Sequence, residues 1–86
     1  MNDSHHFQIH GADTPTLLGR LALMLNRNRV TVRMFEMHPR PEQRDLRVSF
    51  EIHCGQEMAV RVARQLDQLV DVHEVNWSTR AHVTAA

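Results

Sequence analysis

Several residue types are scarce or absent in this chain of 86 residues, and these absences exclude classes of protein. The only cysteine is Cys54, so an internal disulfide is excluded and a reducing compartment is expected. The longest unbroken apolar stretch, 21–25, is far too short to cross a membrane. The first six residues are polar with no apolar run behind them, unlike a signal peptide. We therefore expect a cytoplasmic protein with no membrane partner.

An excess of positive charge is also absent. Lysine does not occur, and ten arginines balance ten acidic residues, so the formal net charge is zero. Proteins that bind nucleic acid normally present a basic face to the phosphate backbone. RNA-recognition domains also stack bases on aromatic residues exposed on central strands. In the strand predicted over 46–53, the one aromatic residue, Phe50, is expected to face the core instead. We expect no nucleic-acid partner.

Hydrophobic periodicity predicts six elements in the order β-α-β-β-α-β. A period of two predicts a short strand around 7–9 and further strands over 30–38, 46–53 and 70–77. Thr14 is expected to cap the first helix, because Pro15 suits the first helical position. Pro39-Arg40-Pro41 is expected to form the turn between the two middle strands. Residues expected to face inward are Leu18, Leu21, Ala22 and Leu25 in the first helix, Ala59, Val62, Ala63 and Leu66 in the second, and Leu46, Val48, Phe50 and Ile52 in the third strand. The second strand is expected to carry Val30, Val32 and Met34 on one face and Phe35 and Met37 on the other, so one of these sets has no place in the core. In the fourth strand, Val70 and Val72 are expected to lie on one side.

This order favours an α+β fold, the ferredoxin-like βαββαβ sandwich, in which a four-stranded antiparallel sheet carries two helices on one face. The expected domain covers 7–77. It lies between a flexible N-terminus at 1–6 and a flexible tail at 78–86.

Seven histidines raise the question of a metal site. In the predicted sheet His6 comes near His53, and His10 near His73, at opposite ends of the helix-free face. Zinc sites need about four clustered ligands, and Cys54 has no companion cysteine, so we expect no metal ion.

Sequence motifs of common enzyme classes are also absent: the chain has no G-x-S-x-G, H-E-x-x-H, phosphate-loop or dinucleotide-binding motif. We expect no catalytic residue and no cofactor in this chain.

Apolar residues in excess of one core favour contact with another protein. Domains of this size bury only about two-thirds of their surface and often depend on oligomerisation. The surplus residues lie on the flanks of the first helix, on an edge strand and near the end of the last strand, and sheet edges need to be covered. The residues assigned to this interface are Leu17, Leu23, Met24, Phe35, Met37 and Trp77.

Three segments give the chain a family resemblance. Residues 65–75, QLDQLVDVHEV, match a Q-L-x-K-L-V-D-V-x-x-V pattern except that Gln68 replaces the lysine, and Leu18-Gly19-Arg20-Leu21 and Ala81-His82-Val83 add weaker similarity. The chain resembles ACT domains, the small ligand-sensing modules of amino-acid metabolism. Within them it is most similar to the small regulatory subunit of acetolactate synthase (acetohydroxyacid synthase). Its length resembles that of the short, valine-insensitive isozyme II subunit.

The resemblance implies a non-catalytic subunit that activates a large catalytic chain in the biosynthesis of valine, isoleucine and leucine. That partner, the acetolactate synthase large subunit, is expected to hold thiamine diphosphate, magnesium and FAD. The small chain is expected to form a homodimer through its ACT domains. The alternative is a free-standing ACT-domain dimer that senses another amino acid.

The resemblance also implies an effector pocket at a two-chain interface. Valine-sensing members carry an N-x-x-G-x-L pattern before the first helix, where backbone N–H groups receive the effector's carboxylate and glycine permits close approach. Here Asp13 replaces the asparagine and Thr16 the glycine, so a repelling carboxylate and a side chain predict weak or no valine binding. The residues expected at this pocket are Asp13, Thr16, Leu17, Leu18, Thr31 and Val32.

Overall fold

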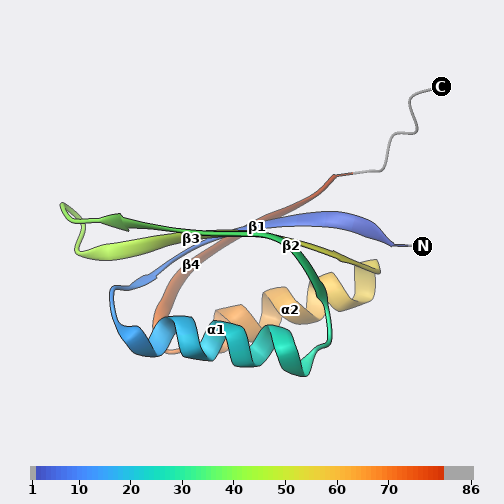
Figure 1. The fold of residues 1–86 in the computed structure, drawn as a ribbon, viewed down its shortest axis with the longest axis horizontal. Coiled ribbons are helices and arrows are strands. Elements are labelled where there is room, and N and C mark those ends of the chain that lie inside the picture. The colour runs from blue at the N-terminus through green and yellow to red at the C-terminus, as the bar shows by residue number, and fades with distance from the viewer. Residues whose placement is uncertain (1, 81–86) are drawn as a thin grey trace.

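The computed structural model describes residues 2–80 and contains the six predicted elements in the predicted order (Figure 1). Their bounds are β1 Asp3–Ala12, α1 Pro15–Arg27, β2 Thr31–Arg40, β3 Asp45–Cys54, α2 Gln56–Gln68 and β4 Val72–Arg80. Neither helix in this part of the chain has the length and hydropathy needed to span a membrane.

The sheet has the strand order β2-β3-β1-β4, and every neighbouring pair is antiparallel. Both helices cover one face of the sheet, and the other face carries no helix (Figure 1). The strands β2 and β3 follow each other in the chain without an intervening helix and form a hairpin. Each helix connects two strands that are not adjacent in the sheet. This arrangement confirms the predicted α+β, ferredoxin-like βαββαβ sandwich.

The core lies between the sheet and the two helices, and the period of two in β3 determines one side of it. The inward residues of β3 are all buried, as predicted, because the central strand is covered by the helical layer. Phe7 of β1 stacks on Phe50 of β3 with ring centroids 5.1 Å apart. The helix α2 contributes Ala59, Val62 and Leu66, and Ala63 packs partly against them, which confirms the inward face predicted for that helix.

The helix α1 is rotated relative to the prediction. Its buried residues are Leu17, Leu21, Met24 and Leu25, whereas Leu18 is 45% exposed and Ala22 is exposed. Both sets have spacings of three and four, because apolar residues occur on both flanks of this helix, so the periodicity alone does not choose between them. Leu17 and Met24 are therefore core residues of the single chain, and their assignment to an interface stays a prediction.

A β-bulge changes the faces of β2. Val32 pairs with Ile52, but the next pair is Met34 with Glu51, so Arg33 is the extra residue. Beyond it, Phe35 pairs with Phe50 and Met37 with Val48, both on the inward face of β3. Val32, Phe35 and Met37 thus share the helix side of the sheet, and Met34 lies on the opposite side. The prediction that Val32 and Met34 share one face, with Phe35 and Met37 on the other, is therefore wrong.

A second register shift affects β4. His10 pairs with Glu74 and Gly11 with Val72, so His73 is the extra residue. Val72 is buried as predicted, but Val70 precedes the strand and is 86% exposed, which contradicts the expectation for that residue. After the shift, Val75 and Trp77 pack against the core.

The sheet is longer than predicted at three places. The strand β1 begins at Asp3 and β4 ends at Arg80, so residues 3–6 and 78–80 belong to the sheet rather than to terminal segments. The strand β2 continues through Pro39 and Arg40, and the turn occupies 41–44 instead of 39–41. Proline is tolerated there because β2 is an edge strand. The segment Ala81-His82-Val83 and the rest of the predicted tail after Arg80 lie outside the described residues.

Candidate functional site

Two histidines of the helix-free face, His10 and His73, contact carboxylates. Nδ1 of His10 lies 2.5 Å from Oε2 of Glu74, and Nε2 of His73 lies 3.1 Å from Oδ2 of Asp45. His6 pairs across the sheet with Glu51. Within residues 2–80, no group of three or more histidine, cysteine, aspartate or glutamate side chains is arranged to hold a metal ion.

Asp45 is the centre of the tightest polar cluster. Its side chain is 7% exposed and accepts two hydrogen bonds from Arg40, at 2.7 and 2.6 Å, in addition to the contact with His73. The hydrogen bond from Arg40 and, to a smaller extent, that from His73 lower the pKa of Asp45 to about 2. These contacts connect β2, β3 and β4 across one end of the sheet, so we assign the cluster a structural role.

A buried histidine was missed by the sequence analysis. His5 lies in phase with Phe7 and Ile9 and is fully buried. Its Nε2 donates to the backbone carbonyl of Cys54 at 2.9 Å, and its Nδ1 lies 3.0 Å from Oγ1 of Thr79. The alternation of β1 was the signal that could have identified His5.

Burial raises the pKa of the Cys54 thiol, which favours the unreactive protonated form.

The residues expected at the effector pocket lie in two groups at opposite ends of α1. Asp13 and Thr16 lie at its N-terminal end, while Thr31 and Val32 follow its C-terminal end at the start of β2 (Figure 1). A helix of 13 residues is about 20 Å long. A single chain therefore does not bring these two groups together, and Leu17, the fifth member, is buried in the core.

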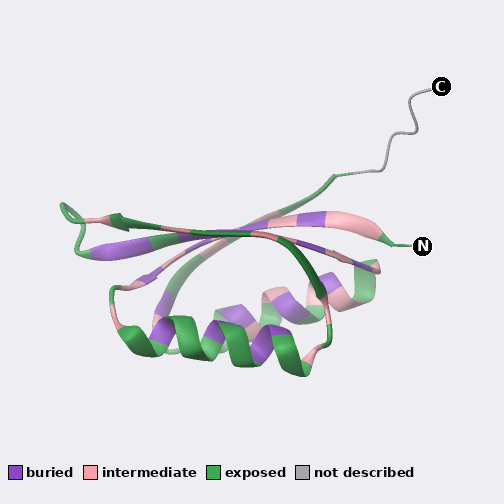
Figure 2. Ribbon diagram, in the orientation of Figure 1, coloured by how far each residue is buried: buried purple, intermediate pink, exposed green. Residues whose placement is uncertain are grey.

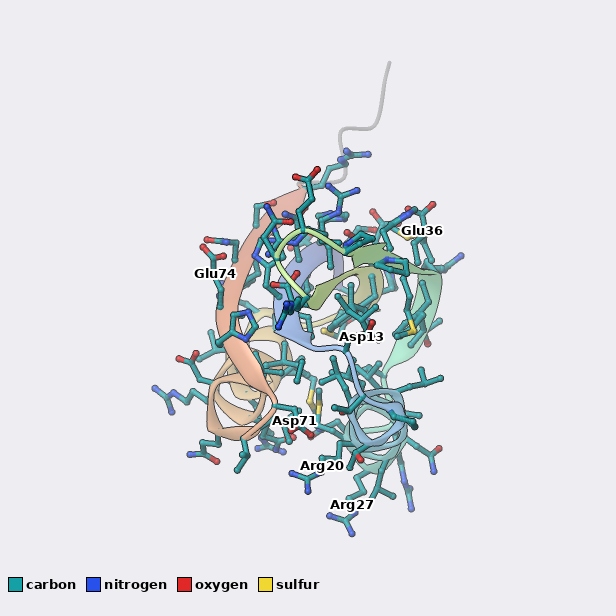
Figure 3. The ribbon with its side chains drawn as sticks, turned by 90° about the vertical axis from the view of Figure 1, so that its left-hand side faces the viewer. Asp13, Arg20, Arg27, Glu36, Asp71 and Glu74 are labelled. Atoms are coloured by element: carbon teal, nitrogen blue, oxygen red, sulfur yellow. The ribbon has the colours of Figure 1, made fainter. Side chains whose placement is uncertain are left out.

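The N-terminal end of α1 contains two buried polar atoms without a hydrogen-bond partner in the described part of the chain, Oγ1 of Thr14 and Oδ2 of Asp71. Thr14 is the N-cap residue, but its side chain caps no N–H group, contrary to the prediction. The Asp71 oxygen lies 3.7 Å from Nε of Arg20. With Asp13 on the adjacent loop (Figure 3), this end of the helix carries two carboxylates.

An apolar groove of about 440 Å³ lies between α1 and the edge strand β2; we call it the edge groove. It combines Leu18 and Val32, both predicted at the effector pocket, with Phe35, predicted at the interface. Phe35 is 36% exposed and Val32 41% exposed. Most of β2 is exposed in the single chain (Figure 2). The remaining lining residues are Ala22, Leu25, Asn26 and Val30.

A second groove, of about 460 Å³, lies between α1 and α2; we call it the helix groove. Arg20 and Arg27 line it from α1, and the amides of Gln65 and Gln68 line it from α2. Leu23, 49% exposed, lies between the two arginines in sequence and also lines the groove. Its other lining residues are Met24, Asn28 and Leu69.

The residues predicted at the interface separate into three groups. Leu23 and Phe35 have exposed apolar surface, in the helix groove and the edge groove respectively. Met37 and Trp77 are half-buried against the core, and Trp77 stacks on Phe7 at 5.4 Å. Leu17 and Met24 are buried, as described above.

The chain is similar in fold to several solved structures at low sequence identity. An ACT domain from the GTP pyrophosphokinase of Chlorobium tepidum superposes with a TM-score of 0.78 at 10% identity, covering 91% of this chain and 100% of that one. An uncharacterized protein of Thermotoga maritima gives the same TM-score at 11% identity, with 92% and 98% covered. A homoserine dehydrogenase from Thiobacillus denitrificans gives 0.76 at 9% identity over 92% of this chain but 17% of its own. No family model matches the sequence, and no curated protein does. The chain thus has the fold of an ACT domain.

Proposed function

We propose that this chain is a non-catalytic regulatory ACT domain that acts through contact with other protein chains. The observation that carries the proposal is the edge groove, where Leu18, Val32 and Phe35 expose apolar surface beside the edge strand β2. Exposed apolar groups next to a free sheet edge are the usual mark of an interaction surface. The ionisable side chains of the clusters described above contact one another within the sheet, which supports a binding role over a chemical one.

The first partner is a second copy of the same chain. If two copies pair antiparallel along β2, the two-fold axis places the α1 helices side by side in opposite directions. The N-terminal end of α1, with Asp13 and Thr16, then lies near the start of β2 of the second copy, with its Thr31 and Val32. This dimer brings together the two groups of effector residues that one chain keeps about 20 Å apart. It also covers both edge grooves.

The second partner is the large subunit of acetolactate synthase. The segment 65–75, which supports this part of the proposal, forms the end of α2, the turn at 70–71 and the start of β4. The large subunit would supply the thiamine diphosphate, magnesium, FAD and chemistry. The small chain would bind one conformation of it more tightly and so increase that conformation's population. A difference of about 1.4 kcal/mol in binding changes the population ratio tenfold.

The decisive experiment combines the purified chain with the acetolactate synthase large subunit of the same organism. We expect the two to co-purify by size exclusion and the rate of acetolactate formation to rise until the large subunit is saturated. The large subunit with bovine serum albumin at the same concentration is the control for non-specific stabilisation. Separate elution together with an unchanged rate would contradict the proposal.

A free-standing ACT dimer that senses another amino acid is the alternative. The fold similarity does not distinguish the two functions, because the similar ACT domain quoted above comes from a GTP pyrophosphokinase. The two functions differ in a simple measurement. Under the alternative, the chain is a dimer whose melting temperature rises with one of the twenty amino acids, and it does not bind the large subunit.

A further inference from the structure

The helix groove carries a local positive charge. Two arginines line it, Arg20 and Arg27, and its lining contains no acidic residue. They are seven positions apart on α1, which places them on one side of the helix two turns apart. Figure 3 shows both side chains extending away from the sheet. The chain as a whole has zero net charge, so this positive groove is a local feature.

Arg20 and Arg27 make few ion pairs with the described residues of the domain. Among residues 2–80, Arg27 forms no ion pair with a carboxylate. Arg20 has one long contact, 3.7 Å from Asp71, and its side chain is 46% exposed. Arg27 in the last turn of α1 interacts favourably with the helix dipole. This interaction with the helix dipole involves Arg27 and does not require the groove, so it does not explain why Arg20 also lines the groove.

The groove also has an apolar element. Leu23 is exposed between the two arginines, and Met24 and Leu69, from α1 and from the residue after α2, contribute further apolar surface. The amide of Asn28 bonds to Gln65 across the groove at 2.6 Å, which fixes the two helices relative to each other at one end. A rigid apolar surface with two flanking cations is complementary to a chain segment that carries an apolar side chain and flanking carboxylates.

The geometry points to the helix groove as the docking site for an acidic segment of the large subunit, in which an apolar side chain contacts Leu23 and carboxylates pair with Arg20 and Arg27. This inference rests on the proposed function. It assigns the two grooves to different partners, since the edge groove is covered by the second copy. A small anion alone is a poorer fit, because it would pair with the arginines and leave Leu23 exposed.

The test compares variants of the full chain for binding to the purified large subunit by biolayer interferometry. Arg27→Glu and Leu23→Ser are each expected to raise Kd about tenfold. Arg20→Gln is the milder change at the other arginine, chosen so that no new carboxylate lies beside Asp71. Arg64→Glu on α2 is the matched control, since it makes the same charge reversal on the helical layer outside the groove lining; it should change Kd less than threefold. Circular dichroism verifies that each variant is folded.

Each outcome has a defined meaning. Loss of binding confined to the groove variants supports the docking site. Equal Kd values for all variants, or equal weakening by Arg27→Glu and Arg64→Glu, overturn the docking site while the proposed function stands. If the unaltered chain does not bind the large subunit, both are overturned. Citrate is the probe for a small anion: citrate binding that is lost in Arg27→Glu, with large-subunit binding intact, also overturns the docking site.

Discussion

Gly11 lies directly against the backbone of Asp71. A Cβ atom on Gly11 would be 2.8 Å from the carbonyl oxygen of Asp71 and 2.8 Å from Cδ2 of Leu17. The next amide in the chain, that of Ala12, donates a hydrogen bond to the same carbonyl at 2.7 Å. This contact joins the end of β1, the first turn of α1 and the segment before β4 at the place where the β4 register shifts.

Gly11→Ala is therefore expected to destabilise the domain. The added methyl group forces the Asp71 backbone away and weakens the hydrogen bond from Ala12, at a cost of about 1–3 kcal/mol in the free energy of unfolding. Gly19→Ala is the matched control, because nothing lies within 4 Å of its Cβ position and alanine in a helix is favoured by about 0.5–1 kcal/mol. Urea unfolding followed by circular dichroism measures both. Similar free energies for the two variants would show that the contact at Gly11 is not tight in solution.

His5→Leu tests the buried histidine. Leucine fills similar space but leaves the carbonyl of Cys54 without its donor, so we expect a loss of about 1–3 kcal/mol in the free energy of unfolding. Thr79→Val removes the other partner and should cost about 0.5–1.5 kcal/mol. The effects of the two changes should not add in the double variant, because both residues belong to one network. His6→Leu, on the opposite face of β1, is the control and should change stability by about 0.5 kcal/mol or less.

The parts of the fold that follow from local periodicity were predictable from the sequence. In β3 one face is apolar and the other polar from Leu46 to His53, so only one orientation buries the apolar side. The helix α1 shows the limit: Leu17, Leu18, Leu23 and Met24 place apolar groups on both flanks, and only packing against α2 and the sheet selects the buried set.

The register shifts were not predictable for a different reason. A bulge is a property of two strands together, and nothing in 30–38 alone marks Arg33 as the extra residue. The same holds for the candidate sites. The edge groove is lined by residues of α1 and β2, and the helix groove by residues of α1 and α2. Both depend on contacts between segments far apart in sequence.

The stabilising effect of Asp45 should depend on pH in one direction. Its pKa is lowered from the usual 3.8 to about 2 in the folded protein, so folding favours the ionised form. The contribution of Asp45 to the free energy of unfolding is complete well above pH 4, and it disappears as the pH falls through about 2. Asp45→Asn should therefore lower the free energy of unfolding at pH 7, with a difference from the unaltered chain that shrinks between pH 4 and pH 2. Thermal unfolding at pH 7, 4 and 2.5 measures this. A difference that stays constant down to pH 2.5 would show that the ion pair with Arg40 contributes nothing.

Val32→Glu should convert the proposed dimer to monomers. Val32 is exposed in one chain and covered in a β2-to-β2 dimer, where the new carboxylate would be buried against the second copy without a partner. We expect the dimer dissociation constant to rise at least tenfold, measured by sedimentation equilibrium. Glu36→Gln lies on the opposite face of the same strand and should leave the dissociation constant unchanged. A monomeric unaltered chain at 100 μM (about 1 mg/ml) would rule out a dimer of this kind, since stable interfaces of standard size give much tighter association.

Valine binding is expected to be weak and to improve when two residues are changed. A free amino acid brings a carboxylate to the N-terminal end of α1, where Asp13 and Asp71 already place negative charge and the Thr16 side chain occupies space. Asp13→Asn removes one charge, and Thr16→Gly opens the approach to the backbone N–H groups. In titration calorimetry the unaltered chain should give no saturable heat with millimolar valine, and the double variant should bind at least tenfold more tightly. Asp67→Asn, which makes the same charge change on α2, should have no effect.

Because the second half of the pocket comes from the other copy, the gain in valine affinity should also vanish when Val32→Glu is added to the double variant. This result separates a two-chain site from one formed by the helix end alone.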